Sequence, residues 1–284
     1  MGLFFQETFY NNMPELPEVE TTRRGIEPYL LKQKITKIII RQSRLRWPIP
    51  PCLESALTNQ VIQSVCRRGK YLILTTKTGH LLIHLGMSGH LRIVSHDTLP
   101  TKHDHFDLIC ANQQLLRFND PRRFGAILWT TQSLDEHPLL KKLGPEPLSG
   151  AFKIEYLAPK AKNKKVPVKT FIMNSQVVVG VGNIYANEVL FKSKINPKTP
   201  AGKIKQARLQ QLIQEIKTTL TAAIKQGGTT LKDFYGAQGQ KGYFSLSLAV
   251  YGRGGKPCLR CKTTLKEIKI NQRQTVYCQQ CQKP

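Results

Sequence analysis

Four cysteines near the C-terminus place the tightest constraint on how this chain can fold. Cys258 and Cys261 form one Cys-x-x-Cys pair, and Cys278 and Cys281 form a second pair after sixteen intervening residues. Two such pairs supply four thiolates for a closed tetrahedral site, the arrangement in which zinc is bound when its role is structural. No histidine lies among them, so we expect no open position for a catalytic water. The spacing predicts a small finger organised by one structural Zn²⁺.

The remaining three cysteines, Cys52, Cys66 and Cys110, occur singly in or near strand-like segments. Isolated cysteines of this kind commonly act as small apolar packing residues, so we expect all three to be buried. An odd total of seven, with four in two tight pairs, fits metal binding in a reducing compartment better than a disulfide scaffold.

The charge of the chain is large and uneven. Lys and Arg number 43 against 18 Asp and Glu, a formal net charge of +25, and residues 156–284 hold 23 basic and 4 acidic residues. A folded chain this basic repels itself, and binding to a polyanion relieves the repulsion while releasing counterions. Anionic lipid is the weaker alternative, because the sequence has no basic amphipathic helix with aromatic anchors and no bilayer-length apolar run. We therefore expect a nucleic-acid partner and no membrane.

Short extended segments rich in Val, Ile, Leu, Phe or Tyr fill the first part of the chain. They cover residues 35–41, 71–76, 80–85, 91–94, 106–110, 115–119 and 125–130. Many short strands separated by Gly and Asp-Pro turns predict an antiparallel sandwich or barrel. A helix should precede these strands, because Pro17 suits a first helical turn and the acidic Glu18 and Glu20 complement its N-terminal dipole.

The pattern changes between residues 135 and 160, where prolines recur and strand signals stop. Apolar residues then recur at three- and four-residue steps over 204–224 and end at Gly227-Gly228, which predicts a long amphipathic helix. Between the cysteine pairs, residues 264–278 predict a β-hairpin with Arg273 at or near its tip. Two roles stay open for Arg273, a solvated turn residue or a probe for a phosphate or a DNA groove.

A glycine-rich turn over residues 177–183 leads into a predicted helix at 183–191. It is not a dinucleotide-binding loop, because Tyr185 replaces the third glycine and no βαβ unit surrounds it. The turn either offers backbone N–H groups and Asn183 to a DNA phosphate or is an ordinary helix entry. The pair His103 and His105 lacks further metal ligands nearby, which favours a polar strand edge or a phosphate donor.

The segment that begins Met13-Pro14-Glu15 is chemically the most informative. If translation starts at Met13 and that methionine is removed, Pro14 exposes a secondary amine, whose unperturbed pKa is roughly 8. Such an amine can condense with a sugar aldehyde carbon to give a cationic iminium, an electron sink for elimination of neighbouring phosphates. Glu15 could then move protons, and Lys70 could supply a second acid or base.

Several motifs together resemble bacterial formamidopyrimidine-DNA glycosylase, also called 8-oxoguanine-DNA glycosylase/AP lyase. Besides the four-cysteine finger, the matching segments are residues 13–26, 44–48, 84–89, 120–125, 143–148, 179–186 and 226–234. The resemblance runs in order from Met13 to the C-terminus. The related endonuclease for oxidised pyrimidines has Gly where Leu16 stands, and it ranks second. A non-catalytic zinc-finger protein that binds damaged DNA is the rival from another class, but it leaves Pro14, Glu15 and Lys70 unexplained.

The resemblance implies an α+β fold and a monomer. An N-terminal antiparallel β-sandwich with flanking helices is followed by a helical helix-two-turn-helix domain and a C-terminal β-hairpin zinc finger. The expected boundaries are a non-family extension at 1–12, a catalytic domain at 13–145, a DNA-binding domain at 146–248 and the finger at 249–283. Duplex DNA would lie in the cleft, with the damaged base flipped out of the stack. The expected location is the bacterial cytoplasm, in association with nucleoid DNA.

The resemblance also assigns roles by position. Pro14 is the expected nucleophile at C1′, Glu15 its acid/base partner, Lys70 a helper in β-elimination, and Arg273 a phosphate grip that assists δ-elimination. Three residues are expected to fill the gap left by the flipped base, and four to bind the DNA backbone. These are Met87, Arg122 and Phe124 for the gap, and His103, Lys165, Lys169 and Asn183 for the backbone. Residues 226–243 correspond to a loop that closes over 8-oxoguanine.

The first twelve residues depart from the family pattern. With Met1 to Asn12 attached, Pro14 has only an amide nitrogen and cannot form an iminium. Either Met13 is the natural start, or the extension is trimmed, or the longer polypeptide is inactive. We expect the first, because Met13 is present and the extension has no targeting character.

Overall fold

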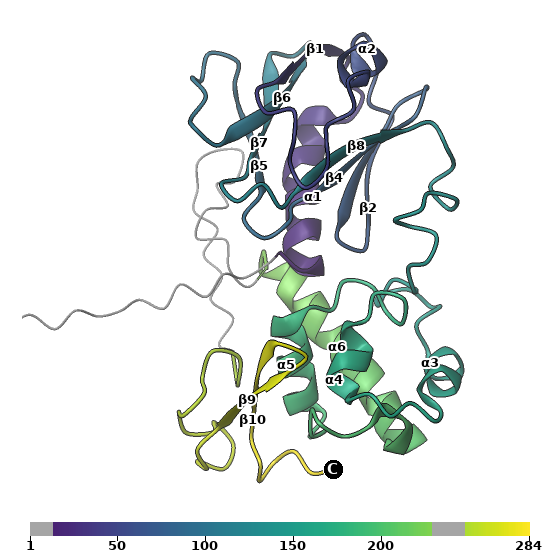
Figure 1. Ribbon diagram of the computed structural model, residues 1–284, viewed down its shortest axis with the longest axis vertical. Coiled ribbons are helices and arrows are strands. Elements are labelled where there is room, and N and C mark those ends of the chain that lie inside the picture. Colours follow the sequence, from purple (N-terminus) through teal and green to yellow (C-terminus); the bar gives the residue numbers. More distant parts are fainter. Residues whose placement is uncertain (1–13, 229–247) are drawn as a thin grey trace, which may run out of the picture.

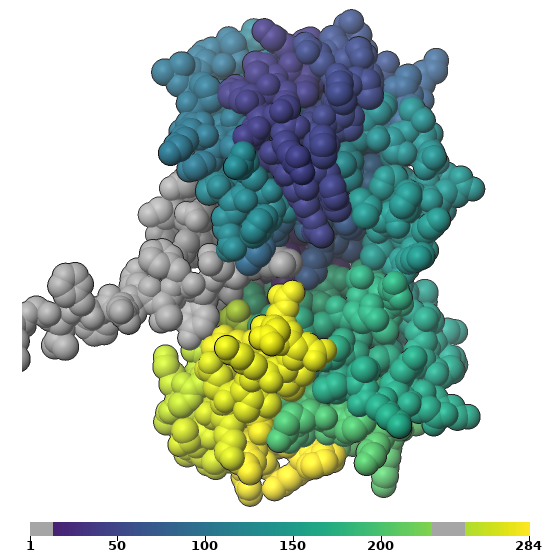
Figure 2. Space-filling view, in the orientation of Figure 1, coloured from purple at the N-terminus to yellow at the C-terminus, as the bar shows by residue number. Residues whose placement is uncertain are grey.

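A computed structural model describes residues 14–228 and 248–284 of the chain. A β-rich domain forms one half of the molecule, and a helical domain with a small hairpin forms the other (Figure 1). The space-filling view shows the C-terminal finger packed beside the helical domain and reaching toward the β-rich domain (Figure 2). The predicted α+β class and order of parts are confirmed.

The β-rich domain begins with helix α1 (Leu16–Leu30), which has Pro17 in its first turn as predicted. The Glu18 carboxylate accepts a hydrogen bond from the backbone N–H of Glu15 at 3.0 Å, so it caps a donor that the helix itself cannot pair. Val19, Ile26 and Leu30 face the core of the domain. The short helix α2 (Leu53–Leu57) was not anticipated from the sequence.

Two four-stranded antiparallel sheets form the sandwich. One has the order β1-β6-β7-β5, and the other has the order β2-β3-β4-β8. The strands of the first are β1 (Ile35–Ile40), β5 (His90–Ser95), β6 (Asp104–Cys110) and β7 (Gln114–Asn119). Those of the second are β2 (Ser64–Arg68), β3 (Tyr71–Thr75), β4 (His80–His84) and β8 (Ala126–Thr130). Their facing apolar side chains join one core, which explains the alternating patterns of the sequence.

The helical domain contains four α-helices and a short 3₁₀ turn in its described part. They are α3 (Ile154–Ala161), α4 (Val168–Met173), α5 (Asn183–Lys192), the 3₁₀ turn η1 (Ala201–Lys203) and α6 (Gln206–Lys225). The helical domain has a hydrophobic core of its own, and most of the apolar residues predicted to form one face of α6 are buried in it. Ala207, which belongs to the same predicted apolar face, is exposed. Helix α6 also contacts α1 across the domain boundary. Among the described helices, none is long and apolar enough to cross a membrane.

The finger is a hairpin of β9 (Lys266–Ile270) and β10 (Arg273–Tyr277). Asn271 and Gln272 form its two-residue turn with positive φ angles of 46° and 59°, as tight hairpins require. Arg273 is therefore the first residue of the returning strand, directly after the tip. The burial prediction for single cysteines is only partly correct: Cys110 is buried, whereas Cys52 and Cys66 are exposed. Cys52 precedes the surface helix α2, and Cys66 points outward from β2.

A buried ion cluster lies in the first sheet. The Arg117 guanidinium donates to both Asp107 carboxylate oxygens at 2.9 and 3.0 Å, and Arg41 contacts the same carboxylate. Arg92 and Asn119 hold the neighbouring Asp104 carboxylate at 2.7 and 2.8 Å. Charges taken out of water in this way need all their partners, because an unpaired buried charge is strongly unfavourable.

Arg117→Ala should destabilise the protein by about 3–5 kcal/mol, because it leaves the Asp107 charge buried without its bidentate partner. Arg24→Ala is the matched control, since Arg24 is 58% exposed where it pairs with Glu20. Its loss should cost at most about 1 kcal/mol. The measurement is the free energy of unfolding in urea, and equal losses in the two variants would contradict the prediction.

Candidate functional site

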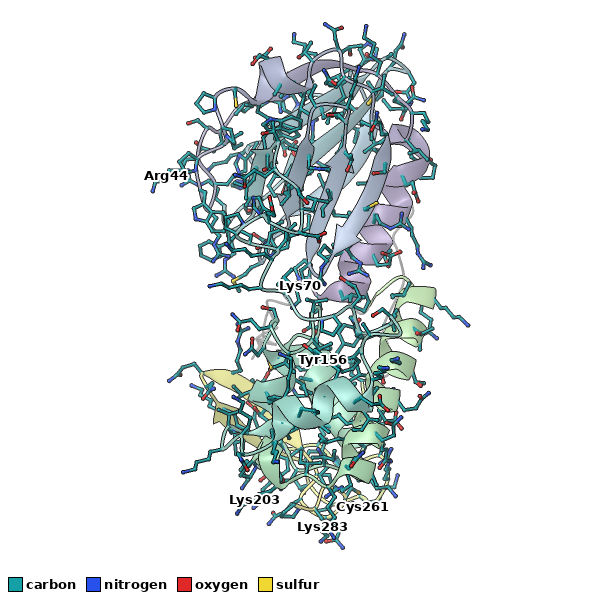
Figure 3. The ribbon with its side chains drawn as sticks, turned by 90° about the vertical axis from the view of Figure 1, so that its right-hand side faces the viewer. Arg44, Lys70, Tyr156, Lys203, Cys261 and Lys283 are labelled. Atoms are coloured by element: carbon teal, nitrogen blue, oxygen red, sulfur yellow. The ribbon has the colours of Figure 1, made fainter. Side chains whose placement is uncertain are left out.

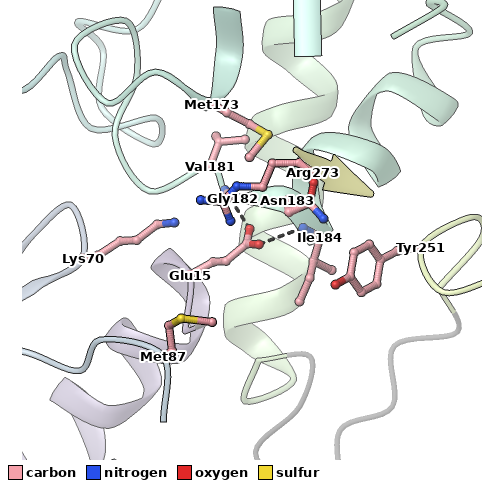
Figure 4. A pocket seen from close by; sticks show the side chains of 10 residues that line it. All are labelled: Glu15, Lys70, Met87, Met173, Val181, Gly182, Asn183, Ile184, Tyr251 and Arg273. Carbon is pink, nitrogen blue, oxygen red and sulfur yellow. Dashed lines mark hydrogen bonds between the residues drawn. The ribbon is translucent and has the colours of Figure 1, made fainter. Parts of the chain in front are cut away.

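A pocket of about 150 Å³ lies where the sandwich, the helical domain and the finger meet. Its lining comes from seven separate parts of the chain, and Figure 4 shows their side chains around the pocket. The lining residues are Glu15, Lys70, Met87, Met173, Val181, Gly182, Asn183, Ile184, Tyr251 and Arg273. Three of the four predicted catalytic residues therefore meet in one place, although they lie up to 258 positions apart.

The Glu15 carboxylate is the central polar group of the pocket. It is 2% exposed and accepts backbone hydrogen bonds from Gly182 and Ile184, both at 2.7 Å, and from Tyr185 at 3.4 Å. These donors are the free N–H groups at the start of α5, where the helix dipole favours a negative charge. The glycine-rich turn is thus the entry to α5, and its backbone N–H groups bind the Glu15 carboxylate of the same chain.

Two glycines make this close approach possible. A Cβ on Gly182 would lie 2.2 Å from Cδ of Glu15, and one on Gly180 would lie 2.4 Å from Leu16 Cβ. Gly180 also has a φ of 81°, and its carbonyl oxygen accepts the Leu16 N–H at 3.1 Å. Glycine at positions 180 and 182 therefore leaves the space in which the start of α1 packs.

The electrostatics of the pocket couple Glu15 to Lys70. Burial raises the pKa of Glu15 to about 7, opposed by the positive charge of Lys70. Burial lowers the pKa of Lys70, opposed by Glu15 and then Glu18. Both groups are thereby moved toward neutral pH, where an acid or base works best. Lys70 lies at the end of the sandwich that faces the helical domain (Figure 3).

Pro14 is buried and directly precedes Glu15, so it lies beside the same pocket. Lys70 lies in the turn between β2 and β3, which positions its side chain. Glu146, in the segment between the domains, accepts the Gly69 N–H at 2.7 Å and pairs with Arg67 at 2.7 Å and Arg68 at 3.2 Å. The connection between the domains thus also holds the turn that carries Lys70.

Met87, Arg122 and Phe124 lie on two loops that pack against each other. A Cβ on Gly86 would lie 2.4 Å from the Phe124 backbone, so the β4–β5 loop touches the β7–β8 loop. The Arg122 guanidinium stacks on the Phe124 ring at 4.9 Å, and that ring is 45% exposed. Their common location agrees with a shared role, although that role itself stays a prediction.

The predicted backbone-binding residues are not equivalent. The Lys165 side chain is exposed. His103 lies beside the β7–β8 loop, because its carbonyl oxygen accepts a hydrogen bond from the Asp120 N–H at 3.0 Å. The Oδ1 atom of Asn183 is buried without a partner among the described residues. Lys169, by contrast, is 1% exposed and donates to Gln274 O at 2.7 Å and Thr275 Oγ1 at 2.8 Å. Burial lowers its pKa to about 7.

The two histidines do not form a metal site in the described residues. His105 Nε2 is 2.9 Å from the Asp120 carbonyl oxygen, so this ring serves the strand edge. The four cysteines are the one cluster of metal-binding side chains found there, with their sulfurs within 4.8 Å of one another. Sulfurs around one zinc at a Zn–S distance of about 2.3 Å are about 3.8 Å apart, which this cluster fits. Cys261 lies far from Lys70 in Figure 3.

Two lining residues, Met173 and Tyr251, were not predicted from the sequence. Tyr251 is positioned by Glu188 of α5, whose carboxylate accepts the N–H groups of residues 249, 250 and 251, each at 2.9 Å. A single acid inside a helix gives no signal of such a contact. The predicted loop at 226–243 lies outside the described residues from position 229 onward, as does the extension at 1–12.

Three family descriptions match successive parts of the chain. Residues 13–127 match the formamidopyrimidine-DNA glycosylase N-terminal domain, and residues 143–235 match the H2TH domain of the same glycosylase. Residues 255–284 match the zinc finger found in FPG and IleRS. The fit of the four sulfurs and this match identify one structural zinc site.

Similar proteins cover nearly the whole chain. Formamidopyrimidine-DNA glycosylase of Photobacterium profundum is 55% identical over 271 residues, 95% of this chain and 100% of the relative. The FPG structure from Thermus thermophilus has a TM-score of 0.84 at 34% identity, covering 95% of this chain and 98% of that one. A mutant Lactococcus lactis FPG bound to Fapy-dG-containing DNA has a TM-score of 0.87 at 34% identity, with coverages of 95% and 100%.

Glu15→Gln should remove a pH dependence of stability. The unfolded carboxyl loses its proton near pH 4.5, whereas the folded one keeps it to about pH 7. The folded state therefore binds the extra proton, and the stability of the wild type relative to Glu15→Gln should fall by about 3 kcal/mol as pH rises through this window. Urea unfolding at pH 5, 6, 7 and 8 measures it, with the exposed Glu54→Gln as control; a constant difference would refute the assignment.

Cys258→Ala should reduce the zinc content from one ion per chain to none, because three thiolates no longer close the tetrahedron. Amide exchange should then accelerate across residues 266–277, whereas the sandwich strands keep their protection. Cys66→Ala, which removes an exposed single cysteine, should retain the zinc. Elemental analysis and hydrogen-exchange mass spectrometry report both outcomes, and retention of zinc by Cys258→Ala would contradict the site.

Proposed function

Because this chain belongs to the formamidopyrimidine-DNA glycosylase family, we propose that its interdomain pocket is where an oxidised purine is released from duplex DNA. The protein is a base-excision repair enzyme, a DNA glycosylase and abasic-site lyase that acts on damaged double-stranded DNA. The meeting of Pro14, Glu15, Lys70 and Arg273 at one interface carries the proposal. Its substrates are 8-oxoguanine and formamidopyrimidines.

The first step is substitution at the sugar. The free amine of Pro14 forms a bond to C1′, the glycosidic bond breaks, and the base leaves with the bonding electrons and takes up a proton. Opening of the sugar ring then gives an iminium that joins Pro14 to the sugar. Glu15, with a pKa of about 7, is suited to deliver and accept protons in these steps. It also holds the start of α1, and with it Pro14, against α5.

Two eliminations follow from the iminium. Loss of a proton from C2′ expels the 3′ phosphate as the C3′–O bond breaks, and loss of the C4′ proton expels the 5′ phosphate. Lys70, whose pKa burial lowers, is the proposed base for the first elimination. Arg273, exposed on β10 and directed into the pocket, is proposed to hold a phosphate and to favour the second. Water finally releases Pro14 from the sugar remnant.

The surrounding residues are proposed to hold the opened duplex. Met87, Arg122 and Phe124 would enter the space of the flipped base, with the Arg122 donors facing the acceptor atoms of the orphaned cytosine. His103, Lys165 and Asn183 would contact phosphates. Lys169 shares that prediction, but its inward hydrogen bonds favour a supporting role. The zinc fixes the finger that carries Arg273 and takes no part in these steps.

We also propose the bacterial cytoplasm, with nucleoid DNA, as the place of action, since that DNA is the substrate. The domain divisions at 145/146 and 248/249 are part of the same proposal. In support of the first division, strand β8 ends at Thr130 and helix α3 begins at Ile154, so strands give way to helices within this interval. A boundary near 145 falls within this interval.

Borohydride should trap a covalent complex between 8-oxoguanine duplex and protein that begins at Pro14, because the reductant fixes the iminium as a stable amine. The matched control is the same protein with Met13 retained, which presents only an amide nitrogen and should give no complex. Denaturing gel electrophoresis with a labelled duplex measures both. Tight binding without a trapped complex in the Pro14-first form would favour the non-catalytic DNA-binding alternative.

A further inference from the structure

The outer edge of strand β10 is held by side chains of the helical domain. Strand β10 pairs with β9 along one edge, so the main-chain groups on its other edge need different partners. On that edge, the Val276 N–H donates to Asn187 Oδ1 at 2.8 Å, and the Gln274 carbonyl accepts from Lys169 Nζ at 2.7 Å. Residues two apart in a strand present their main-chain groups on the same side, as these contacts require.

Asn187 connects this strand to the other side of the pocket. Its Nδ2 donates to the Asn183 carbonyl oxygen at 2.6 Å, one turn earlier in α5, while its Oδ1 accepts from Val276. The side chain is 2% exposed. An amide whose donor and acceptor ends are both used has a fixed orientation. Asn183 of α5 and Arg273 of β10 both line the pocket. The buried Asn187 amide therefore connects the two elements that carry them.

Arg273 is three residues before Val276 in β10 and therefore about 10 Å away along the strand. Between them, Thr275 is fully buried and Gln274 is held by Lys169. Lys169 can lose its charge near neutral pH, because burial lowers its pKa to about 7. Asn187 has no charge to lose, so its hydrogen bond to β10 is independent of pH in this range.

We propose that Asn187 is a positioning residue that sets where Arg273 meets the DNA. Removing its amide leaves the Val276 N–H buried without a partner, which favours displacement of β10 from α5. Displacement of β10 moves the first residue of the strand, Arg273, relative to Glu15 and Lys70. The inference rests on the proposed role of Arg273 in holding a DNA phosphate.

A double-mutant cycle tests this inference, because a residue that acts through Arg273 has no effect once Arg273 is gone. The four proteins are wild type, Asn187→Ala, Arg273→Ala and the double variant. The measurement is the affinity for a duplex with a tetrahydrofuran abasic analogue, by fluorescence anisotropy at fixed salt. This duplex carries the phosphates but needs no reaction, so the full chain can be used. Zinc content is measured for every variant.

Arg273→Ala should weaken binding about tenfold, the effect of losing one charge-assisted hydrogen bond. Asn187→Ala should weaken binding about fivefold in the wild type and less than twofold in the Arg273→Ala background. Asn196→Ala is the matched control. It removes the amide donor to Gln282 O at 3.4 Å, at the far end of the finger, and should keep wild-type affinity.

The possible outcomes separate the two proposals. If Arg273→Ala weakens binding but Asn187→Ala does not, the positioning role is overturned while the role of Arg273 stands. If Asn187→Ala weakens binding equally in both backgrounds, Asn187 acts by another route and the inference is again wrong. If Arg273→Ala binds as the wild type does, both proposals fail. If Asn187→Ala loses zinc, Asn187→Leu takes its place, because leucine fills a similar volume and still removes the acceptor for Val276. Loss of zinc in that variant too would assign Asn187 a purely structural role and overturn the inference.

Discussion

A buried carboxylate at the N-terminus of one helix holds the functional part of this protein together. Glu15 accepts hydrogen bonds from Gly182, Ile184 and Tyr185, and so joins the first residues of the sandwich domain to α5 of the helical domain. The contact is possible because Gly182 has no Cβ to occupy the space of the carboxylate. It fixes Pro14 at the interface. The burial of the Glu15 carboxylate in this contact also raises its pKa to about 7. The carboxylate that joins the two domains is therefore also the proposed acid/base group.

Helix α5 binds the other elements that line the pocket. Its start receives Glu15, Asn187 in its middle holds strand β10, and Glu188 binds the three N–H groups of residues 249–251. Residues 184–191 are all buried, as expected for a helix surrounded by other elements. Ten residues thus position Glu15, Arg273 and Tyr251 relative to one another. The zinc site completes the arrangement, since it stabilises the hairpin from the end opposite to Arg273.

The strong positive charge has two uses. Exposed cations such as Lys165 remain available to phosphates, whereas Arg117 and Lys169 are buried and bind groups of the protein itself. Net charge therefore identifies the class of partner correctly but does not say which lysine touches it. The family relationship supplies duplex DNA as that partner, and the orientation of each side chain decides its part in the binding.

The sequence alone determined the features that depend on residues close together in the chain. The cysteine spacing predicted the metal site, because two-residue gaps place paired thiolates on one ion, and the alternating strands predicted the sandwich. The succession Met13-Pro14 predicted amine chemistry at Pro14, which stays a prediction. Only the tertiary structure showed that Glu15 fills the helix entry at residue 182, that Lys169 turns inward to strand β10, and that Tyr251 lines the pocket. These partners lie more than 60 positions apart, and a local pattern carries no information on which distant donor will reach a given carboxylate. The folded geometry makes that selection, because a buried polar group is stable only where its partner is within hydrogen-bond reach.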